Sequence, residues 1–233
     1  MKFKEGDIVI ASSNNDDAKV GKFLDYNEQI HGVKVPNVEF ADGQVLMCFG
    51  HVIPHSEEMV ERLSKLTPIQ QFDLLTYLKD WGNGKEFILM RGCPGSGKST
   101  KAKQLVGNGQ ICSTDDYWCM NDENEYRFNI HKLGEAHKWN QRRSLEALKA
   151  GVPIVIIDNT NTTIKELRSY SEHIKLAAQL GYTVRIEEPE TAWRFDLEEL
   201  LKKGTHNVPR KTVQAMIDRY EKDVLLEDII FQK

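Results

Sequence analysis

The sequence predicts an α/β fold: a parallel sheet with helices on both faces, together with a small β-rich domain at the N-terminus. The first observation is that apolar, strand-like runs alternate with helical patterns from residue 85 onward, which is typical of a parallel sheet. The second is that the first of these runs leads into a glycine-rich segment and then into a helix. The third is that residues 1–55 consist of short β-rich runs separated by turn residues.

Residues 1–55 are expected to form a small barrel or meander. Their β-rich runs recur at about ten-residue spacing, with turns such as Asp42-Gly43 between them. The opening Gly6-Asp7-Ile8-Val9 resembles the start of SH3- and Tudor-like modules. A segment this short has little core of its own, so we expect it to pack on the residues after it. Two roles stay open for it, binding of a protein or nucleic acid and a purely structural or oligomerising one.

Residues 56–84 are predicted to be a helical linker. Ser56, followed by two glutamates, predicts the start of one helix. Thr67-Pro68 predicts another, because Thr favours the N-cap and Pro the first helical position. The run Trp81-Gly82-Asn83-Gly84 ends the helical pattern and marks the boundary of a domain over residues 85–233.

The alternation within residues 85–233 predicts each element in turn. The run Ile154–Ile157 is apolar and β-branched throughout, as in a buried parallel strand. Gly151 and Gly181 end the helical patterns on either side of it. The expected strands cover residues 86–91, 110–113, 152–157 and 182–186, and the expected helices cover residues 97–106, 131–150, 163–180, 191–203 and 209–222.

Composition and charge limit the function classes. The 233 residues are 40% hydrophobic and 28% charged, as in ordinary globular proteins. The net charge of −4 argues against a protein that coats nucleic acid non-specifically, because such proteins are usually strongly basic. The chain has no apolar run of a length that would span a membrane and no signal-peptide pattern at its start. Its four cysteines form no C-x-x-C pair, so we expect reduced thiols in a cytoplasmic protein.

A phosphate-binding motif occupies residues 92–99, where Gly-Cys-Pro-Gly-Ser-Gly-Lys-Ser matches G-x-x-x-x-G-K-[ST] between an apolar strand and a helix. Glycines let backbone N–H groups surround phosphate oxygens, and the helix N-terminus adds positive potential. Lys98 is expected to reach the β- and γ-phosphates of ATP or another nucleoside triphosphate, and Ser99 to bind Mg²⁺. The motif therefore predicts a P-loop NTPase-type sheet. The expected nucleotide-binding residues are Gly92, Pro94, Gly95, Ser96, Gly97, Lys98, Ser99 and Thr100.

Acidic residues follow two of the predicted strands. Asp115 and Asp116 come after residues 110–113, and Asp158 comes directly after residues 154–157. Because the carboxyl ends of parallel strands lie along one edge of the sheet, these carboxylates are expected near the phosphate-binding loop. Asp158 is expected to hold Mg²⁺ directly or through water, and Asp115 to be able to take a proton from an attacking hydroxyl. The alternative for the Asp115–Asp116 pair is to cap the next helix.

Two further segments carry polar side chains that suit a phosphotransferase. Asn159 and Asn161 are expected to bind substrate or to cap the helix after them. The segment over residues 202–210 joins two helices and contains Lys202, Lys203 and Arg210 together with a histidine. Phosphoryl transfer needs positive charge on the moving phosphate, which a mobile lid often supplies. A solvated basic loop at a helix C-terminus is the alternative.

Together these motifs resemble the P-loop kinase domain of polynucleotide kinases, in particular the NEDD4-binding protein 2 and phage types. The resemblance implies transfer of the ATP γ-phosphate to a 5′-hydroxyl end of DNA or RNA, with Asp115 as the general base. It also implies a basic lid in which Lys203 stands at the position of the family's arginine, with Lys202 and Arg210 as alternatives. The matching residues are 91–100, 113–117, 136–141, 157–161, 208–209 and 218–220.

Two positions depart from the family's pattern. Trp118 stands where phage enzymes carry an arginine that holds the acceptor's phosphate, so we expect a different grip, such as base stacking on Trp118. Lys203, in place of an arginine, lacks the bidentate fork. The expected acceptor-binding residues are Asp116, Trp118, Asn159, Asn161 and Arg210.

Two other functions compete with a polynucleotide kinase. The same motif and carboxylate suit a kinase for a nucleoside, a nucleotide or a sugar nucleotide, and the acidic net charge mildly favours such a small acceptor. The chain is less well explained as a nucleotide-binding adaptor, because a binding module needs no proton acceptor such as Asp115.

Overall fold

The computed structural model covers the whole chain and describes residues 8–12, 19–30, 33–40, 45–47, 51–54, 56–67, 69–71, 74, 84–121 and 125–231. The chain divides into two compact units, Met1–Gly82 and Asn83–Lys233. The finer predicted division into a β-rich domain over residues 1–55 and a helical linker over residues 56–84 stays a prediction.

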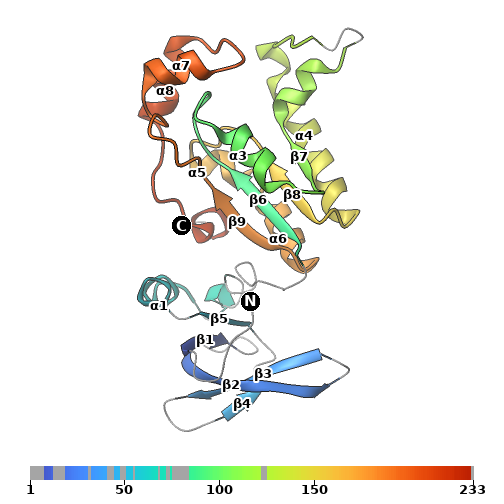
Figure 1. Cartoon of the computed structure of the whole chain (residues 1–233), viewed down its shortest axis with the longest axis vertical. Coiled ribbons are helices and arrows are strands. Elements are labelled where there is room, and N and C mark those ends of the chain that lie inside the picture. Colours follow the sequence, from blue (N-terminus) through green and yellow to red (C-terminus); the bar gives the residue numbers. More distant parts are fainter. Residues whose placement is uncertain are drawn as a thin grey trace. The chain divides into compact units, whose positions relative to one another are not determined.

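The first unit contains an antiparallel sheet of five strands in the order β4-β3-β2-β1-β5 (Figure 1). Val9 and Ala11 are both buried, and as alternate residues of β1 they lie on the same face of the sheet. The predicted β-rich character of the N-terminal part is confirmed, whereas the likeness to SH3 or Tudor modules stays a prediction. The strands are β1 (Ile8–Ser12), β2 (Lys19–Ile30), β3 (Val33–Phe40), β4 (Val45–Met47) and β5 (His51–Pro54).

Helix α1 (Glu57–Ser64) begins where the sequence predicts. The Ser56 hydroxyl accepts a hydrogen bond from Met59 N, which satisfies one of the free N–H groups at the helix start. The Thr67 hydroxyl similarly accepts from Gln70 N, 3.4 Å away, at the second predicted start. The predicted end of that helix at residues 81–83 lies outside the described residues.

The second unit is built on a parallel sheet of four strands in the order β7-β8-β6-β9. Strand β6 pairs with β8 and β9, and four of its five residues are buried, so the predicted parallel sheet is confirmed. The strands are β6 (Glu86–Met90), β7 (Gln110–Cys112), β8 (Ile154–Ile157) and β9 (Thr183–Glu187).

Helices cover both faces of this sheet, as the sequence predicts. Ile88 and Met90 pack with Ala102 of helix α3 on one face. On the other face the ring of Phe87 stacks on that of His173 in helix α6. The helices are α3 (Lys98–Leu105), α4 (Leu133–Lys149), α5 (Ile164–Arg168), α6 (Ser171–Gln179), α7 (Leu197–Lys203), α8 (Arg210–Asp218) and α9 (Leu226–Ile230), with 3-10 helices η1 (Thr114–Cys119) and η2 (Ile130–Lys132).

Three predicted helices differ from the observed ones. The helix predicted over residues 163–180 is divided into α5 and α6, because the chain turns at Ser169, whose hydroxyl bonds back to Glu166 O. The helix predicted over residues 209–222 ends at Asp218, because Arg219 turns its side chain toward α5 and its preceding loop. The sequence did not predict α9.

The helix predicted over residues 191–203 begins only at Leu197, after the cap residue Asp196. The preceding residues form turns that attach to the phosphate-binding loop. The Thr191 hydroxyl donates to Ser96 O at 2.8 Å, and Trp193 Nε1 donates to Gly95 O at 3.2 Å. These contacts, which a helix over this stretch would not allow, explain the later start.

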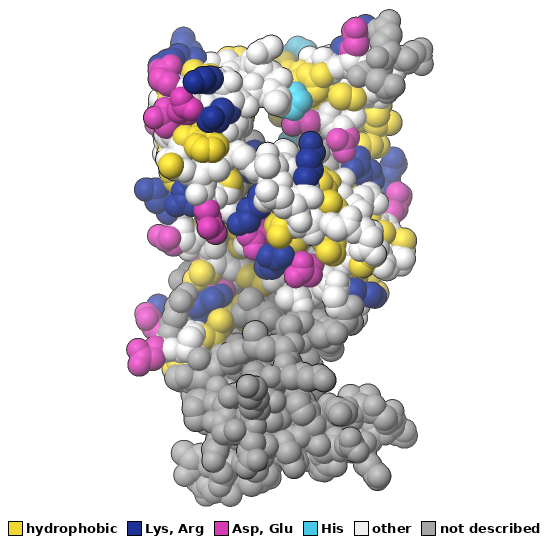
Figure 2. Space-filling model, viewed as in Figure 1, with side chains coloured by type: hydrophobic (Ala, Val, Ile, Leu, Met, Phe, Trp, Pro, Cys, Tyr) yellow, Lys and Arg dark blue, Asp and Glu magenta, His cyan; other side chains and the backbone are white. Residues whose placement is uncertain are grey.

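Lys and Arg are interspersed with Asp and Glu over the face of the second unit seen in Figure 2. None of the described helices has the length and apolar character needed to cross a membrane. Cys93, Cys112 and Cys119 are free thiols, in keeping with the reduced cysteines that the sequence predicts.

Candidate active site

The phosphate-binding loop lies between β6 and α3, and its glycines are required by the backbone. Gly92, Gly95 and Gly97 all have φ in the left-handed region, at 147°, 78° and 101°. A Cβ atom on Gly95 would lie 2.2 Å from Leu200 O, so only glycine lets α7 approach the loop. Pro94 and Ser96 complete the loop, and Lys98, Ser99 and Thr100 form the first turn of α3.

Lys98 is buried beneath this loop, with its ammonium donating to Cys93 O at 3.2 Å. Burial lowers the pKa of Lys98, and the negative charges of Asp158 and Asp115 act in the opposite direction. An anionic ligand in the loop would further favour the charged form. Lys98 thus lies against the phosphate-binding loop, and its contact with the phosphates of a nucleotide stays a prediction.

Two buried oxygens at this site have no hydrogen-bond partner within the described part of the chain, Ser96 Oγ and Asp158 Oδ1. Buried polar atoms are normally paired, so such atoms suit a bound ligand or ion. Burial raises the pKa of Asp158, while Lys98 and a hydrogen bond from Ser99 lower it. A carboxylate and a hydroxyl together fit the oxygen ligands of Mg²⁺, whose remaining positions are filled by water and phosphate.

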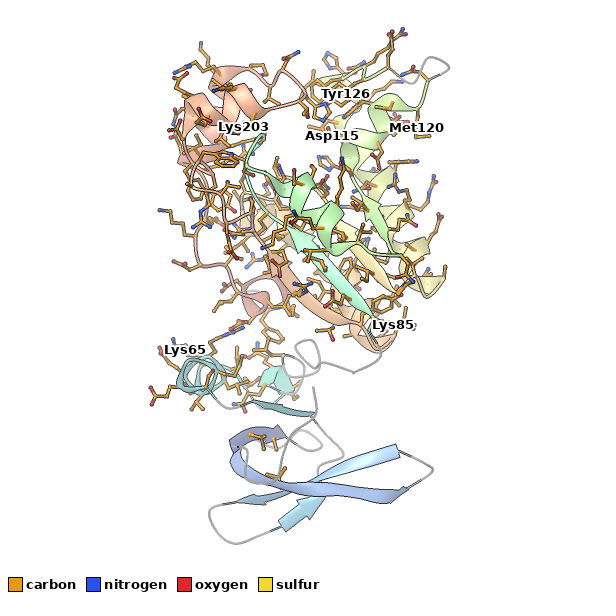
Figure 3. The ribbon with its side chains drawn as sticks, viewed as in Figure 1. Lys65, Lys85, Asp115, Met120, Tyr126 and Lys203 are labelled. Carbon is orange, nitrogen blue, oxygen red and sulfur yellow. The ribbon has the colours of Figure 1, made fainter. Side chains whose placement is uncertain are left out.

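Asp115 lies at the carboxyl end of β7, in the first turn of η1. The Ser113 hydroxyl accepts from Asp115 N and caps this short helix, so the cap is the serine and not the acidic pair. The Asp115 side chain is 49% exposed. Tyr126 donates its hydroxyl to Asp115 Oδ1 at 3.0 Å, and His206 Nε2 lies 3.7 Å from Oδ2 (Figure 3).

Tyr126 and His206 come from two different segments. Tyr126 precedes α4, and His206 belongs to the loop between α7 and α8. Their rings stack, with centroids 4.2 Å apart and planes inclined by 24°. Burial, followed by the charge of Asp115, raises the pKa of Tyr126, so its hydroxyl remains a donor. Asp115 therefore connects the two segments that flank the carboxyl end of the sheet.

Asp116 points to a different partner. Its carboxylate forms an ion pair with Arg143 of α4 at 2.7 Å, and Arg143 also donates to Ile111 O and lies over the ring of Trp139. Asp116 thus ties η1 to α4 in this structure. Among the described residues, Asp115 contacts His206 in the loop between α7 and α8, whereas Asp116 is paired with Arg143 of α4.

The two asparagines after β8 use their amides within the protein. Asn159 accepts from Thr114 N at 3.0 Å and donates to the Tyr170 hydroxyl at 2.8 Å, which joins the segments after β7 and β8. Asn161 is buried with φ of 43° and donates to Met90 O at 2.8 Å. Both side chains therefore stabilise the segments at the carboxyl end of the sheet, and their predicted contact with substrate stays a prediction.

The structure does not expose the ring of Trp118, for which the sequence predicts a role in base stacking. Its side chain is only 4% exposed, because its ring packs edge-on against Tyr117 and Phe128. A base therefore finds little of this ring to stack on, and Trp118 instead supports Phe128 from below. The exposed aromatic surface at this place is that of Phe128.

The basic residues of the segment over residues 202–210 contact different partners. Lys203 Nζ lies 4.4 Å from the ring centroid of Trp193, which itself is bonded to Gly95 O. Lys202 is 3.8 Å from Glu199, and Arg210 forms a paired contact with Glu198. Of these three cations, Lys203 is the one that contacts a residue bonded to the phosphate-binding loop, namely Trp193.

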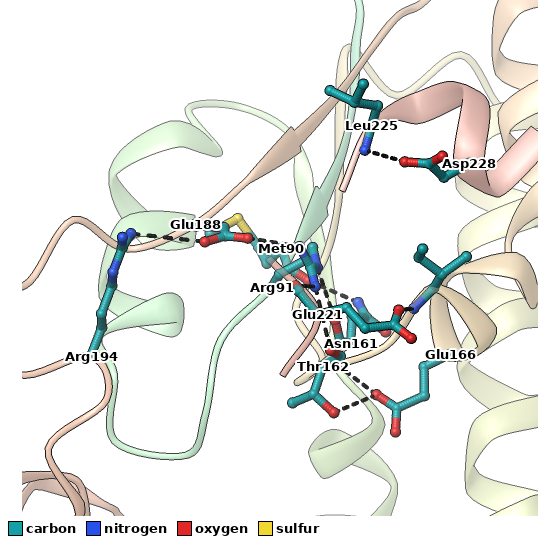
Figure 4. Close-up of polar contacts among 11 residues, drawn as sticks. Met90, Arg91, Asn161, Thr162, Glu166, Glu188, Arg194, Glu221, Leu225 and Asp228 are labelled. Atoms are coloured by element: carbon teal, nitrogen blue, oxygen red, sulfur yellow. Dashed lines mark hydrogen bonds and ion pairs between the residues drawn. The ribbon is translucent and has the colours of Figure 1, made fainter. Parts of the chain in front are cut away.

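Sequence reasoning assigned no role to Arg91, which holds the base of the phosphate-binding loop. Its buried guanidinium donates to Asn161 O at 3.0 Å, to Glu221 O at 2.7 Å and to Glu188 Oε1 at 2.8 Å (Figure 4). These partners follow β8, α8 and β9, up to 130 positions away in the chain. No local pattern marks such partners, although a buried strand that ends in arginine is itself an unusual signal.

Comparison with known proteins identifies a family and several similar proteins. The AAA domain family matches residues 87–222. NEDD4-binding protein 2 from Homo sapiens is 39% identical over 144 residues, which are 60% of this chain and 8% of that protein. The 2′,3′-cyclic-nucleotide 3′-phosphodiesterase from Rattus norvegicus is 30% identical over 146 residues, 60% of this chain and 32% of that protein. The resemblance to NEDD4-binding protein 2 that the motifs predict is confirmed.

Two solved structures of RNA repair assemblies also match. The Pnkp1/Rnl/Hen1 complex gives a TM-score of 0.39 at 24% identity, covering 51% of this chain and 38% of that chain. The Pnkp1/Rnl/Hen1 RNA repair complex gives a TM-score of 0.42 at 19% identity, covering 58% and 44%. The present chain thus spans less than half the length of each of these four proteins.

Proposed function

This chain belongs to the AAA domain family, and we propose that it moves the γ-phosphoryl group of ATP onto the 5′-hydroxyl end of a DNA or RNA strand. The observation that carries the proposal is the setting of Asp115. Its half-exposed carboxylate is coupled by charge to Lys98 of the phosphate-binding loop and is held by the Tyr126 hydroxyl. A module that only binds nucleotide has no need of an oriented, accessible carboxylate beside the place where the γ-phosphate is expected.

In the proposed reaction, Asp115 accepts the proton of the acceptor hydroxyl. The hydroxyl oxygen forms a bond to the γ-phosphorus, and the bond from that phosphorus to the bridging oxygen breaks, which releases ADP. The Tyr126 hydroxyl occupies one lone pair of Oδ1, so the carboxylate keeps acceptor capacity for the substrate. In a loose transition state the position of this base matters more than its strength.

Positive charge for the transferring phosphoryl group is supplied from two sides. Lys98 approaches from beneath the loop, and Lys203 stands at the end of α7 above it. Asp158 and Ser99 would hold Mg²⁺, which when bound neutralises charge on the phosphates. Charge that is already oriented before the reaction stabilises the transition state more than mobile charge does.

The relatives support a nucleotide-type acceptor. The rat protein's name describes action on 2′,3′-cyclic nucleotides, which makes a nucleotide or polynucleotide a better candidate than an unrelated small alcohol. The same name also defines a competing reaction, hydrolysis of a cyclic phosphate. That reaction consumes no ATP, so the two are separable in one set of assays.

The experiment is a transfer panel with γ-³²P-labelled ATP and Mg²⁺. The acceptors are single-stranded DNA and RNA with 5′-hydroxyl ends, the same strands with 5′-phosphates, and free nucleosides, and a 2′,3′-cyclic nucleotide is tested for hydrolysis. We expect label on the 5′-hydroxyl strands alone, and none with Asp115→Asn. Label on nucleosides but not on strands would favour the small-acceptor kinase. Hydrolysis of the cyclic nucleotide without any transfer would overturn the proposal.

A further inference from the structure

The segment that carries Tyr126 has an unusual side-chain pattern. Tyr126, Phe128 and Ile130 alternate with Arg127 and Asn129 in a stretch that is neither helix nor sheet up to residue 129. Three apolar side chains thus alternate in the sequence with one basic and one polar side chain, up to the start of η2 at Ile130.

Apolar side chains of this segment are open to solvent. Phe128 is 53% exposed and Ile130 is 60% exposed, and the nearby Met120 is 62% exposed. These are three of the six large exposed hydrophobic side chains in the described part of the chain. Figure 2 shows hydrophobic side chains gathered next to a histidine on the upper part of the second unit. A cluster of this kind marks a surface for a ligand or partner.

The segment is also held in a defined position. Arg127 N donates to Trp118 O at 3.0 Å, and the Asn121 amide bonds both the N–H and the carbonyl of Glu125. The ring of Phe128 rests edge-on on Trp118, with centroids 5.1 Å apart. A fixed aromatic ring loses little freedom on binding, which favours its use as a stacking surface.

This apolar strip begins at the proposed general base. The Tyr126 hydroxyl is bonded to Asp115, so a strand whose 5′-hydroxyl reaches Asp115 brings its first base beside the Tyr126 ring. Cationic groups lie in the same segment. Arg127 is 60% exposed and forms a solvent-exposed ion pair with Glu125 at 3.2 Å, and His131 and Lys132 are exposed in η2. Aromatic rings next to cations are the usual means of binding single strands, through base stacking and phosphate contacts.

We propose that residues 126–132 form a stacking platform for the first nucleotides of a single-stranded acceptor. Bases stack on Phe128 and on the face of the Tyr126 ring opposite His206, which already stacks on the other face, while Arg127 and Lys132 contact the phosphates that follow. The platform rests on the proposed function, and it selects a strand over a free nucleoside. It also gives Trp118 a new role, as the support of Phe128 in place of a stacking surface of its own.

The test measures binding apart from catalysis. A ten-nucleotide single strand with a 5′-hydroxyl and a 3′-fluorescein is titrated with the full chain, and its fluorescence anisotropy gives Kd. Because a stacked base contributes about 1–3 kcal/mol by alanine substitution, Phe128→Ala should raise Kd by about five- to a hundredfold. Phe128→Trp, which keeps a ring, should stay within about threefold of the wild type. Leu180→Ala removes an exposed apolar side chain at the end of α6 and serves as the matched control.

The outcomes separate the platform from the kinase reaction. Equal Kd values for Phe128→Ala, Leu180→Ala and the wild type overturn the platform, whether or not label is transferred. A kcat/KM for free nucleosides equal to that for strands also overturns the platform. That result leaves the proposed phosphotransfer from ATP intact. Ring-dependent strand binding without any transfer from ATP supports the platform and overturns the kinase function. Equal melting temperatures of the variants exclude unfolding as the cause of a raised Kd.

Discussion

Replacing Asp115 by asparagine removes the proposed proton acceptor and leaves the shape of the site nearly unchanged. The amide has the size of the carboxylate, and its oxygen still accepts the Tyr126 hydrogen bond that now measures 3.0 Å. The variant loses the ability to take the proton of the acceptor hydroxyl. We therefore expect unchanged folding and ATP affinity and a kcat lower by about 10²–10⁴, the usual range for general acid–base catalysis.

Asp116→Asn is the matched control, because it makes the same change one residue along. Asp116 pairs with Arg143, and their side chains are 48% and 26% exposed, so solvent screens the pair. Such a pair contributes about 0–1 kcal/mol to the free energy of unfolding. That corresponds to a melting temperature lower by no more than about 2–4 °C in a protein of this size. We expect a smaller loss of kcat than for Asp115→Asn and an effect mainly on the acceptor KM.

The assay is kcat for both variants at saturating ATP and acceptor, with melting temperatures measured alongside. If Asp116→Asn is the inactive variant and Asp115→Asn keeps a near-normal kcat, the assignment of the general base is wrong. Equal large losses in both variants, with intact folding, would also refute it, because Asp115 contacts His206 and Tyr126 whereas Asp116 is paired with Arg143.

Three other substitutions test the site, and one pH measurement tests the packing of His173 on the sheet. Lys98→Ala should lower turnover by about 10²–10³ or more, and wild-type turnover in a folded variant would refute the P-loop interpretation. Asp158→Asn should shift the Mg²⁺ titration of activity to higher concentration, whereas an unchanged titration would make Asp158 purely structural. Lys203→Ala should lower kcat with little change in ATP affinity, and an unchanged kcat would remove it from the chemical step. Burial lowers the pKa of His173, so the unfolded chain binds more protons, and stability should fall as pH drops below about 6.5. Melting curves at several pH values should show a smaller fall for His173→Gln.

The sequence by itself determined the parallel sheet and the identity of the phosphate-binding loop. Strand β8 could be predicted because four consecutive β-branched residues suit a strand buried on both faces. The loop could be predicted because G-x-x-x-x-G-K-[ST] is a local pattern whose glycines have a backbone reason, as Gly95 shows by its φ of 78°. The position of Asp115 near that loop followed from the parallel topology, which brings strand ends to one edge.

Only the tertiary structure decided what the polar side chains around that loop do. Asn161 was a candidate substrate ligand, yet its amide bonds to Met90 O, 71 positions away. Trp118 was a candidate stacking surface, yet Phe128 covers it. The physical reason is that a polar or aromatic side chain takes whichever partner the fold brings within reach. For Asn161 and for Arg91 that partner comes from a distant strand or loop, so no local sequence pattern predicts it.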